Sequence, residues 1–138
     1  LSGAVGETLL HVCFLSGLPK HMKLLAERLL YHFPKIINDC YVNDEYYGET
    51  VLHMGIVSED PEIVRFLIKC GADVNARCSG NFFISEDQKG NRTDVVNEEH
   101  AQLSKKTSYN GHLYWGEYPL SFAACISQVE CFRMLVAK

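Results

Sequence analysis

The sequence has little that would place it in a membrane, outside the cell or on nucleic acid. No apolar run approaches the roughly 18 residues that a membrane-spanning helix needs, and no segment resembles a signal peptide. The formal net charge is −4, which disfavours nucleic acid and anionic membranes as main partners. We therefore predict that this segment neither inserts into a membrane nor binds nucleic acid. Because the chain begins at Leu1 and ends inside a helical pattern at Lys138, we expect it to be a piece of a longer protein.

The cysteines lack the spacing of a disulfide framework or a zinc site. No CxxC pair occurs, and no set of Cys and His has zinc-ligand spacing. Cys13 and Cys131 stand where small or apolar core residues are expected, and a free cysteine packs well there. We therefore predict a reducing, cytosolic compartment with reduced thiols. The six cysteines are Cys13, Cys40, Cys70, Cys78, Cys125 and Cys131.

The groups that would indicate an enzyme are also missing. Catalysis needs a nucleophile beside a base, paired carboxylates in a cleft, or a phosphate-binding loop, and none is recognisable. His11 near Cys13 and Glu130 next to Cys131 are better explained by packing. We predict that the chain is not an enzyme and binds no metal. The acids within residues 77–115 have no calcium-loop spacing and are Glu86, Asp87, Asp94, Glu98 and Glu99.

Residues 48–76 contain the most informative pattern that is present. Gly48 supplies a turn, and Thr50 can cap a helix that follows it. The Asp-Pro pair at residues 60–61 is typical of a second helix start, and Gly71 is typical of its end. Two short helices cannot bury their apolar faces alone, so this unit is predicted to be one repeat of a stack.

The same pattern occurs on both sides of this unit. Residues 6–11 (GETLLH) carry the same signature as residues 48–53 (GETVLH), and an outer helix is predicted between Pro19 and Pro34. A third copy, GEYPLS, starts at residue 116. There Tyr118 replaces the capping threonine and Ser121 replaces the histidine, so we expect the usual cap and inter-repeat bond to be weakened or remade.

Two connectors separate the copies. In the longer one, the apolar runs 82–84 and 113–115 are predicted to pair as a two-stranded finger. Residues 86–108 between them are polar, and we expect this part to be mobile or disordered. The predicted order is a helix pair at 1–37, a finger connector at 38–47, a helix pair at 48–76, a long, partly disordered finger loop at 77–115 and a truncated helix pair at 116–138.

The repeated signature resembles the ankyrin repeat. G-x-T-x-L-H opens residues 48–76, and GADVNA closes them. The resemblance implies an all-α ankyrin-repeat solenoid fragment of about three repeats with a long finger-loop insertion. It also implies that His53 is structural, bonding to the capping threonine and to the backbone of the next repeat. The positions that match the motif are Gly6, Thr8, His11, Gly48, Thr50, Leu52, His53, Gly71 and Pro119.

A narrower resemblance rests on residues 44–53 (DEYYGETVLH) and 114–125 (YWGEYPLSFAAC). Both resemble segments of the vanilloid-type TRP (TRPV) channels, and their sequences are more similar to an invertebrate sensory member than to a mammalian one. The resemblance implies the cytosolic N-terminal assembly and regulatory domain of a tetrameric, calcium-permeable, non-selective cation channel subunit. It places the domain at the cytoplasmic face of the plasma membrane, with a cilium as one setting. Neighbouring subunits are the implied partners, and calmodulin is a candidate. The alternative is a soluble ankyrin-repeat scaffold or adaptor.

The resemblance also provides a test for ATP, which some family members bind. Those members use lysines in the first copy of the signature, where this chain has Glu7 and His11. Tyr46, which matches their adenine-stacking aromatic, is retained, and Glu49 replaces a polar amide. Without fixed positive charge for a triphosphate, we expect no cofactor, and ATP is disfavoured.

Aromatic residues gather in and beside the two connectors. They could form a small core under each finger, or a protein-binding surface, because Tyr and Trp are favoured in interface hot spots. Both interpretations stay open from the sequence. The predicted interface residues of the fingers and concave face are Tyr46, Tyr47, Glu49, Phe82, Phe83, Tyr114, Trp115 and Tyr118.

Overall fold

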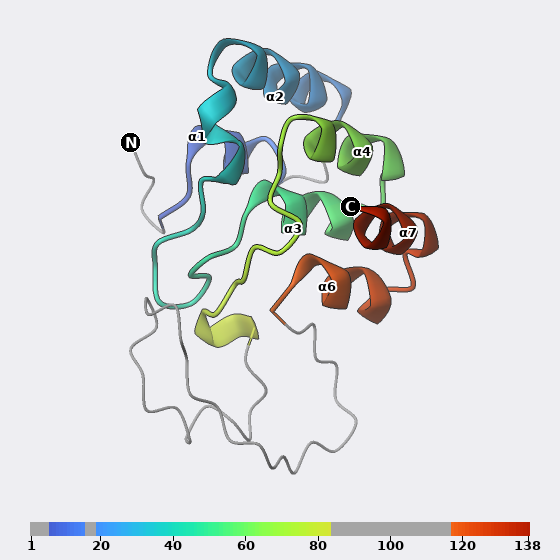
Figure 1. The fold of residues 1–138 in the computed structure, drawn as a ribbon. Coiled ribbons are helices and arrows are strands. Elements are labelled where there is room, and N and C mark those ends of the chain that lie inside the picture. Colours follow the sequence, from blue (N-terminus) through green and yellow to red (C-terminus); the bar gives the residue numbers. More distant parts are fainter. Residues whose placement is uncertain (1–5, 16–18, 84–116) are drawn as a thin grey trace.

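Three helix pairs follow one another along a stack in the computed structural model, which describes residues 6–15, 19–83 and 117–138 (Figure 1). The first helices of the pairs lie in one layer and the second helices in another. No β-strand occurs within these ranges, so the all-α prediction is confirmed over them. The helices are α1 (Leu9–Val12), α2 (Lys20–His32), α3 (Val51–Val57), α4 (Pro61–Lys69), α6 (Pro119–Cys125) and α7 (Val129–Ala137), with 3₁₀ helices η1 (Pro34–Asn38) and η2 (Asn81–Phe83).

A threonine caps the start of the first helix in each of the first two pairs. In α3 the backbone N–H of Thr50 donates to Nδ1 of His53 at 3.1 Å, and the two side chains lie 3.0 Å apart. Thr8 and His11 make the same contacts at the start of α1. Each pair forms a capping box in which histidine takes the place of the usual Glu or Gln. The motif therefore satisfies orphan backbone donors and orients the ring at the same time.

The second helix of the middle pair uses different start and stop signals. The Asp60 carboxylate accepts the backbone N–H of Glu62 at 3.1 Å, and Pro61 takes the first helical position. Lys23 of α2 forms an ion pair with Asp60, so this cap also joins neighbouring repeats. Gly71 follows the helix at φ +95°, a left-handed conformation that favours glycine. Both ends of α4 lie where the sequence predicted them.

Buried histidine rings bond successive repeats together. Because Nδ1 of each ring accepts a threonine N–H, Nε2 carries the proton and donates. His11 Nε2 reaches the carbonyl oxygen of Glu49 at 3.1 Å, and His53 Nε2 reaches that of Glu117 at 3.3 Å. Both rings are fully buried. Burial lowers the pKa of His53 to about 4 and also lowers that of His11, so both rings are neutral at pH 7.

The third pair has no such histidine of its own, and further contacts besides the His53 bond hold it to the second pair. The Tyr118 side chain makes no capping bond to α6. Instead the Phe122 ring packs edge-on to His53, with centroids 4.9 Å apart. The Cys78 N–H donates to the Glu117 carbonyl at 2.8 Å, and Arg77 Nε donates to the Glu117 carboxylate at 3.0 Å. The contact between the second and third pairs thus adds an aromatic pair, a backbone bond and an ion pair to the His53 bond.

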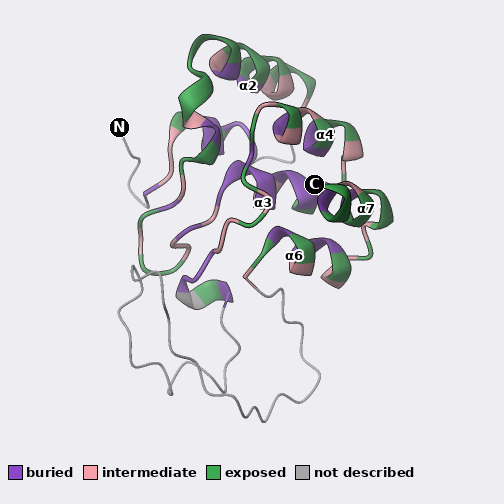
Figure 2. Cartoon of the chain, in the orientation of Figure 1, coloured by how far each residue is buried: buried purple, intermediate pink, exposed green. Residues whose placement is uncertain are grey.

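The apolar core runs between the two helix layers (Figure 2). Gly55 stands where α4 comes close to α3, because a Cβ there would lie 3.0 Å from Leu67 Cδ1. Cys13 and Cys131 are fully buried in the core, and all six cysteines are free. None of the described helices has the length and apolarity required for a membrane span. Packing of their inward apolar faces holds the helices together.

One local prediction is wrong. Phe82 and Phe83 were expected in a strand, but they lie in the 3₁₀ helix η2. The chain turns because it is bonded to the first connector: Phe82 N–H donates to the Glu45 carbonyl at 2.9 Å. The partner strand at 113–115 and the polar stretch 86–108 lie outside the described residues.

We predict that His53→Ala lowers the free energy of unfolding at pH 7 by on the order of 3 kcal/mol, since it removes a cap, an inter-repeat bond and a buried ring. This difference from the wild type should shrink between about pH 6.5 and 4. Over that range the unfolded histidine takes up a proton that the folded ring does not, so its stabilisation is lost as the pH falls. Urea unfolding at several pH values measures both effects.

His21→Ala on α2 is the matched control, because His21 is exposed. It should change stability by no more than about 0.5 kcal/mol. An equal effect of the two substitutions, or a difference that does not depend on pH, would contradict the role assigned to the neutral His53 ring.

Candidate protein-binding surface

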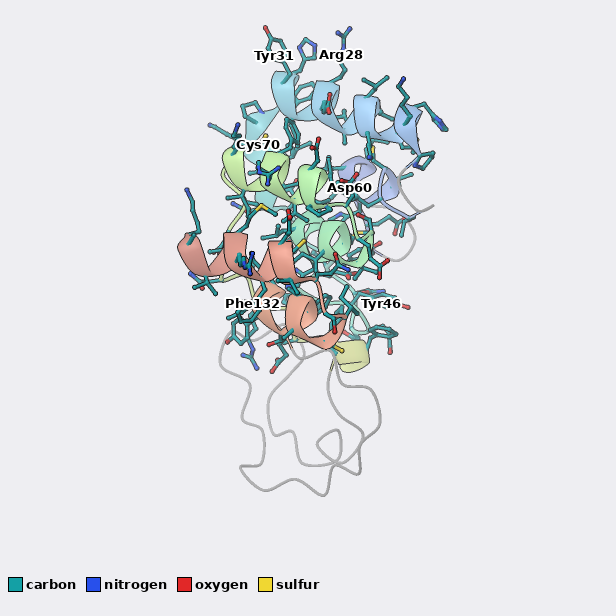
Figure 3. All side chains as sticks on the ribbon, turned by 90° about the vertical axis from the view of Figure 1, so that its right-hand side faces the viewer. Arg28, Tyr31, Tyr46, Asp60, Cys70 and Phe132 are labelled. Carbon is teal, nitrogen blue, oxygen red and sulfur yellow. The ribbon has the colours of Figure 1, made fainter. Side chains whose placement is uncertain are left out.

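The two connectors meet beside α3 and α6 and form a continuous chain of rings. Tyr46 is central: its ring centroid lies 5.7 Å from Tyr41, 5.3 Å from Phe82 and 6.4 Å from Phe83. Phe83 continues the chain to Phe122 at 5.7 Å. In Figure 3, Tyr46 lies beside η2, far from Tyr31 at the end of α2. We call this set the connector cluster; its members are His11, Tyr41, Tyr46, Phe82, Phe83, Phe122 and His53.

Burial divides these aromatics into a core and a surface. Tyr41, Phe83 and Phe122 are at most 4% exposed and act as a small core under the connectors. Phe82 is 51% exposed, and Tyr118 is 44% exposed. The buried rings therefore form a small core, and a protein-binding role for the half-exposed rings stays a prediction. The half-exposed rings rest on a buried aromatic base that fixes their position.

Backbone hydrogen bonds hold the first connector in a tight turn. The N–H of Gly48 donates to the Tyr41 carbonyl at 2.9 Å, and the N–H of Tyr41 donates to the Glu49 carbonyl at 3.0 Å. Asn43 Oδ1 accepts the Tyr46 N–H at 3.0 Å. Gly48 has φ +87°, and a Cβ there would overlap the carbonyl oxygen of Arg77. This glycine lets the second connector pass directly over the first.

The connector cluster surrounds a pocket of about 230 Å³ that contains one carboxylate. Glu49 lines it, and its side chain has no hydrogen bond or ion pair within the described part of the chain. Burial raises the pKa of Glu49 to about 7. Burial, with Glu49 and Glu7 nearby, raises that of Tyr41 to about 12. The other pocket walls come from Tyr46, Val57, Phe82, Phe83 and Phe122.

The charges around the pocket are mostly negative among the described residues. Residues 39–50 include acids and no Lys, Arg or His. Glu7 and Glu117 hold the corresponding positions in the neighbouring repeats, and Arg77 is paired with Glu117. Among the residues that the structure describes, no three His, Cys, Asp or Glu form a possible metal site. The arrangement can hold an apolar or cationic group, and it contains no nucleophile beside a base.

The structure brings together five of the eight predicted interface residues: Tyr46, Tyr47, Glu49, Phe82 and Phe83. Tyr47 takes part through its backbone, because its carbonyl accepts the N–H groups of Ser79 and Gly80 at 2.9 and 3.1 Å. Tyr118 is exposed at the start of α6. Tyr114 and Trp115 lie outside the described residues. Sequence reasoning did not select Phe122 or Val57. The aromatic at position 122, equivalent to Val12 and Met54 in the other repeats, was the available signal.

We predict that Glu49→Gln flattens one component of the pH dependence of stability. The folded carboxyl keeps its proton up to about pH 7, whereas the unfolded one loses it near 4.5. The wild type therefore loses roughly 3 kcal/mol as the pH rises through this range, and the neutral variant does not. Glu49→Gln should match the wild type near pH 4.5 and exceed it by 2–3 kcal/mol, as an order of magnitude, at pH 8.

Chemical unfolding at these two pH values measures the change. Glu27→Gln serves as the control, because Glu27 is exposed on α2; its effect should stay within about 0.5 kcal/mol at both. A Glu49→Gln variant that gained nothing at pH 8 would show that Glu49 is ionised there at no cost.

Comparison with known proteins agrees with this geometry. A family model described as "Ankyrin repeats (3 copies)" matches residues 2–78. Transient receptor potential cation channel subfamily V member 5 of Rattus norvegicus is 31% identical over 134 residues, which cover 97% of this chain and 15% of that protein. Subfamily V member 1 of Canis lupus familiaris is 31% identical over 102 residues, covering 74% of this chain and 10% of that protein.

Subfamily V member 4 of Rattus norvegicus is 32% identical over 101 residues, covering 73% of this chain and 9% of that protein. The chain thus spans only a small part of each of these relatives, which are named as cation channels and not as enzymes. The family model covers the first two helix pairs. The chain belongs to the ankyrin-repeat family, and over up to 97% of its length it is homologous to the vanilloid-type TRP channels.

Proposed function

We propose that this chain is the cytosolic assembly and regulatory domain of a tetrameric, calcium-permeable, non-selective cation channel subunit, placed at the cytoplasmic face of the plasma membrane. The observation that carries the proposal is the connector cluster. It presents half-exposed Phe82 from a rigid base, and Tyr118, which is also half-exposed, lies at the start of α6. The chain is homologous to cation channels over 97% of its length. Neighbouring subunits are the proposed partners.

The physical support is the combination of a stiff scaffold and exposed aromatic rings. Histidine bonds and buried helix faces link each repeat to the next, so a force or displacement at one repeat reaches its neighbour. Aromatic side chains that are already fixed lose little conformational entropy on binding and are common in interface hot spots. A surface of this kind suits a persistent contact between subunits.

Soluble regulators are less favoured by the same surface. The positions that would need lysines for a triphosphate are Glu7 and His11, and the pocket of about 230 Å³ is smaller than the 300–1,000 Å³ typical of sites for drug-sized ligands. These features argue against ATP. Calmodulin and the first connector are both acidic. Calmodulin is therefore not the proposed partner of this surface.

We predict that Phe82→Ala with Tyr118→Ala in the full-length parent protein reduces the tetrameric fraction at least several-fold, with a matching loss of current. Both rings are exposed, so their removal should leave the repeat core intact. Native-size analysis of the purified protein and whole-cell recording measure the two effects. The control is Tyr31→Ala, since Tyr31 is 81% exposed but lies on α2, far from the connectors.

The parent coding sequence beyond residue 138 decides between this proposal and a soluble ankyrin adaptor. A channel subunit should show about six apolar spans of roughly 20 residues. A continuation without such spans would refute the channel proposal, and unchanged tetramers in the double variant would refute the role of the connector cluster.

A further inference from the structure

The pocket in the connector cluster presents two features that rarely occur together. Its walls are largely aromatic, from Tyr46, Phe82, Phe83 and Phe122, and Glu49 is the one carboxylate among the described residues that line it. That carboxylate makes no hydrogen bond or ion pair to any described residue, although burial raises its pKa to about 7. A carboxylate in apolar surroundings is costly to ionise without a partner. The pocket therefore lacks one complementary group.

The chemistry of the walls restricts what that group can be. An anion would meet Glu49 and the acidic connector, and the nearby Arg77 is already bonded to Glu117. A purely apolar group would fill the volume but leave the carboxylate without a partner. A cation satisfies both features, because aromatic ring faces attract positive charge and a carboxylate bonds to it directly.

We propose that this pocket binds the side-chain cation of an arginine presented by a basic protein segment. The planar guanidinium can stack on a ring and bond to the Glu49 carboxylate in a fork geometry, which a lysine ammonium cannot do. The volume of about 230 Å³ suits a single side chain rather than a whole cofactor. This inference deepens the proposed function, on which it rests for taking a protein as the source of the cation.

The surrounding charge also favours a basic segment. The first connector carries Asp39, Asp44 and Glu45, close in sequence to Glu49, and no basic residue lies between 39 and 50. Asp44 and Glu45 are exposed, so they can attract positive residues that flank the bound arginine. Such steering raises the rate of encounter and depends on salt.

Two peptides that differ in one group provide the test. Acetyl-Gly-Ser-Arg-Ser-Gly-amide and its citrulline counterpart, which is nearly isosteric and neutral, are titrated into the isotopically labelled 138-residue chain at pH 8 and followed by NMR. The arginine peptide should shift the resonances of residues 46, 49 and 82, with an affinity at least tenfold above that of the citrulline peptide. A lysine peptide should fall between the two.

Variants locate the site. Glu49→Gln should weaken the arginine peptide at least tenfold and leave the citrulline peptide unchanged, while Phe82→Ala should weaken it several-fold through the lost ring. Glu27→Gln on α2 should have no effect. Equal binding of arginine and citrulline, or unchanged binding by Glu49→Gln, would overturn the inference. So would methylguanidinium alone if it matched the peptide, because the site would then take a free cation rather than a protein segment.

These outcomes are separate from those that test channel assembly. If the arginine peptide does not bind but Phe82→Ala with Tyr118→Ala disrupts tetramers, only the pocket assignment fails. If the peptide binds as expected while the same double variant assembles normally, the proposed assembly role fails and the pocket remains a binding site for arginine.

Discussion

The stack depends on a hydrogen bond from a neutral, buried imidazole to the backbone of the next repeat. His11 and His53 each accept a threonine N–H on one ring nitrogen and donate from the other, to the carbonyls of Glu49 and Glu117. Each ring therefore fixes the start of its own helix and the position of the following connector. A protonated ring could not accept the threonine N–H, so the low pKa of these histidines is part of the structure.

The same bonds place the acidic side chains at the roots of the connectors. The Glu49 carbonyl accepts the His11 ring and the Tyr41 N–H at 3.1 and 3.0 Å. Because the backbone of residue 49 is held in this way, its side chain is free to vary without loss of the repeat contact. Position 49, directly after the Gly48 turn, can therefore carry a binding group without loss of the inter-repeat backbone contact. In this chain that group is a carboxylate facing aromatic rings.

Local signals predicted the helices well, because caps and stops act within a few residues: Thr50 begins α3, Pro61 begins α4 and Gly71 follows its end. The conformation of Phe82 could not be predicted in this way, since it depends on a bond to Glu45 in the other connector. The sequence showed which aromatic residues gather near the connectors. It did not show the pocket, because the pocket walls come from four separate segments that only the stack brings together.

The third repeat links this pocket to the stability of the stack. This repeat has Ser121 where the other two have the bonding histidine. Its helix α6 is held against α3 by Phe122, which packs between His53 and Phe83, in addition to the His53 bond. Phe83 and Phe122 also line the pocket. A group bound there contacts both the connector and the ring that holds α6 against α3. Its binding free energy is therefore available to stabilise the third repeat against the second, which couples occupancy of the connectors to the rigidity of the stack.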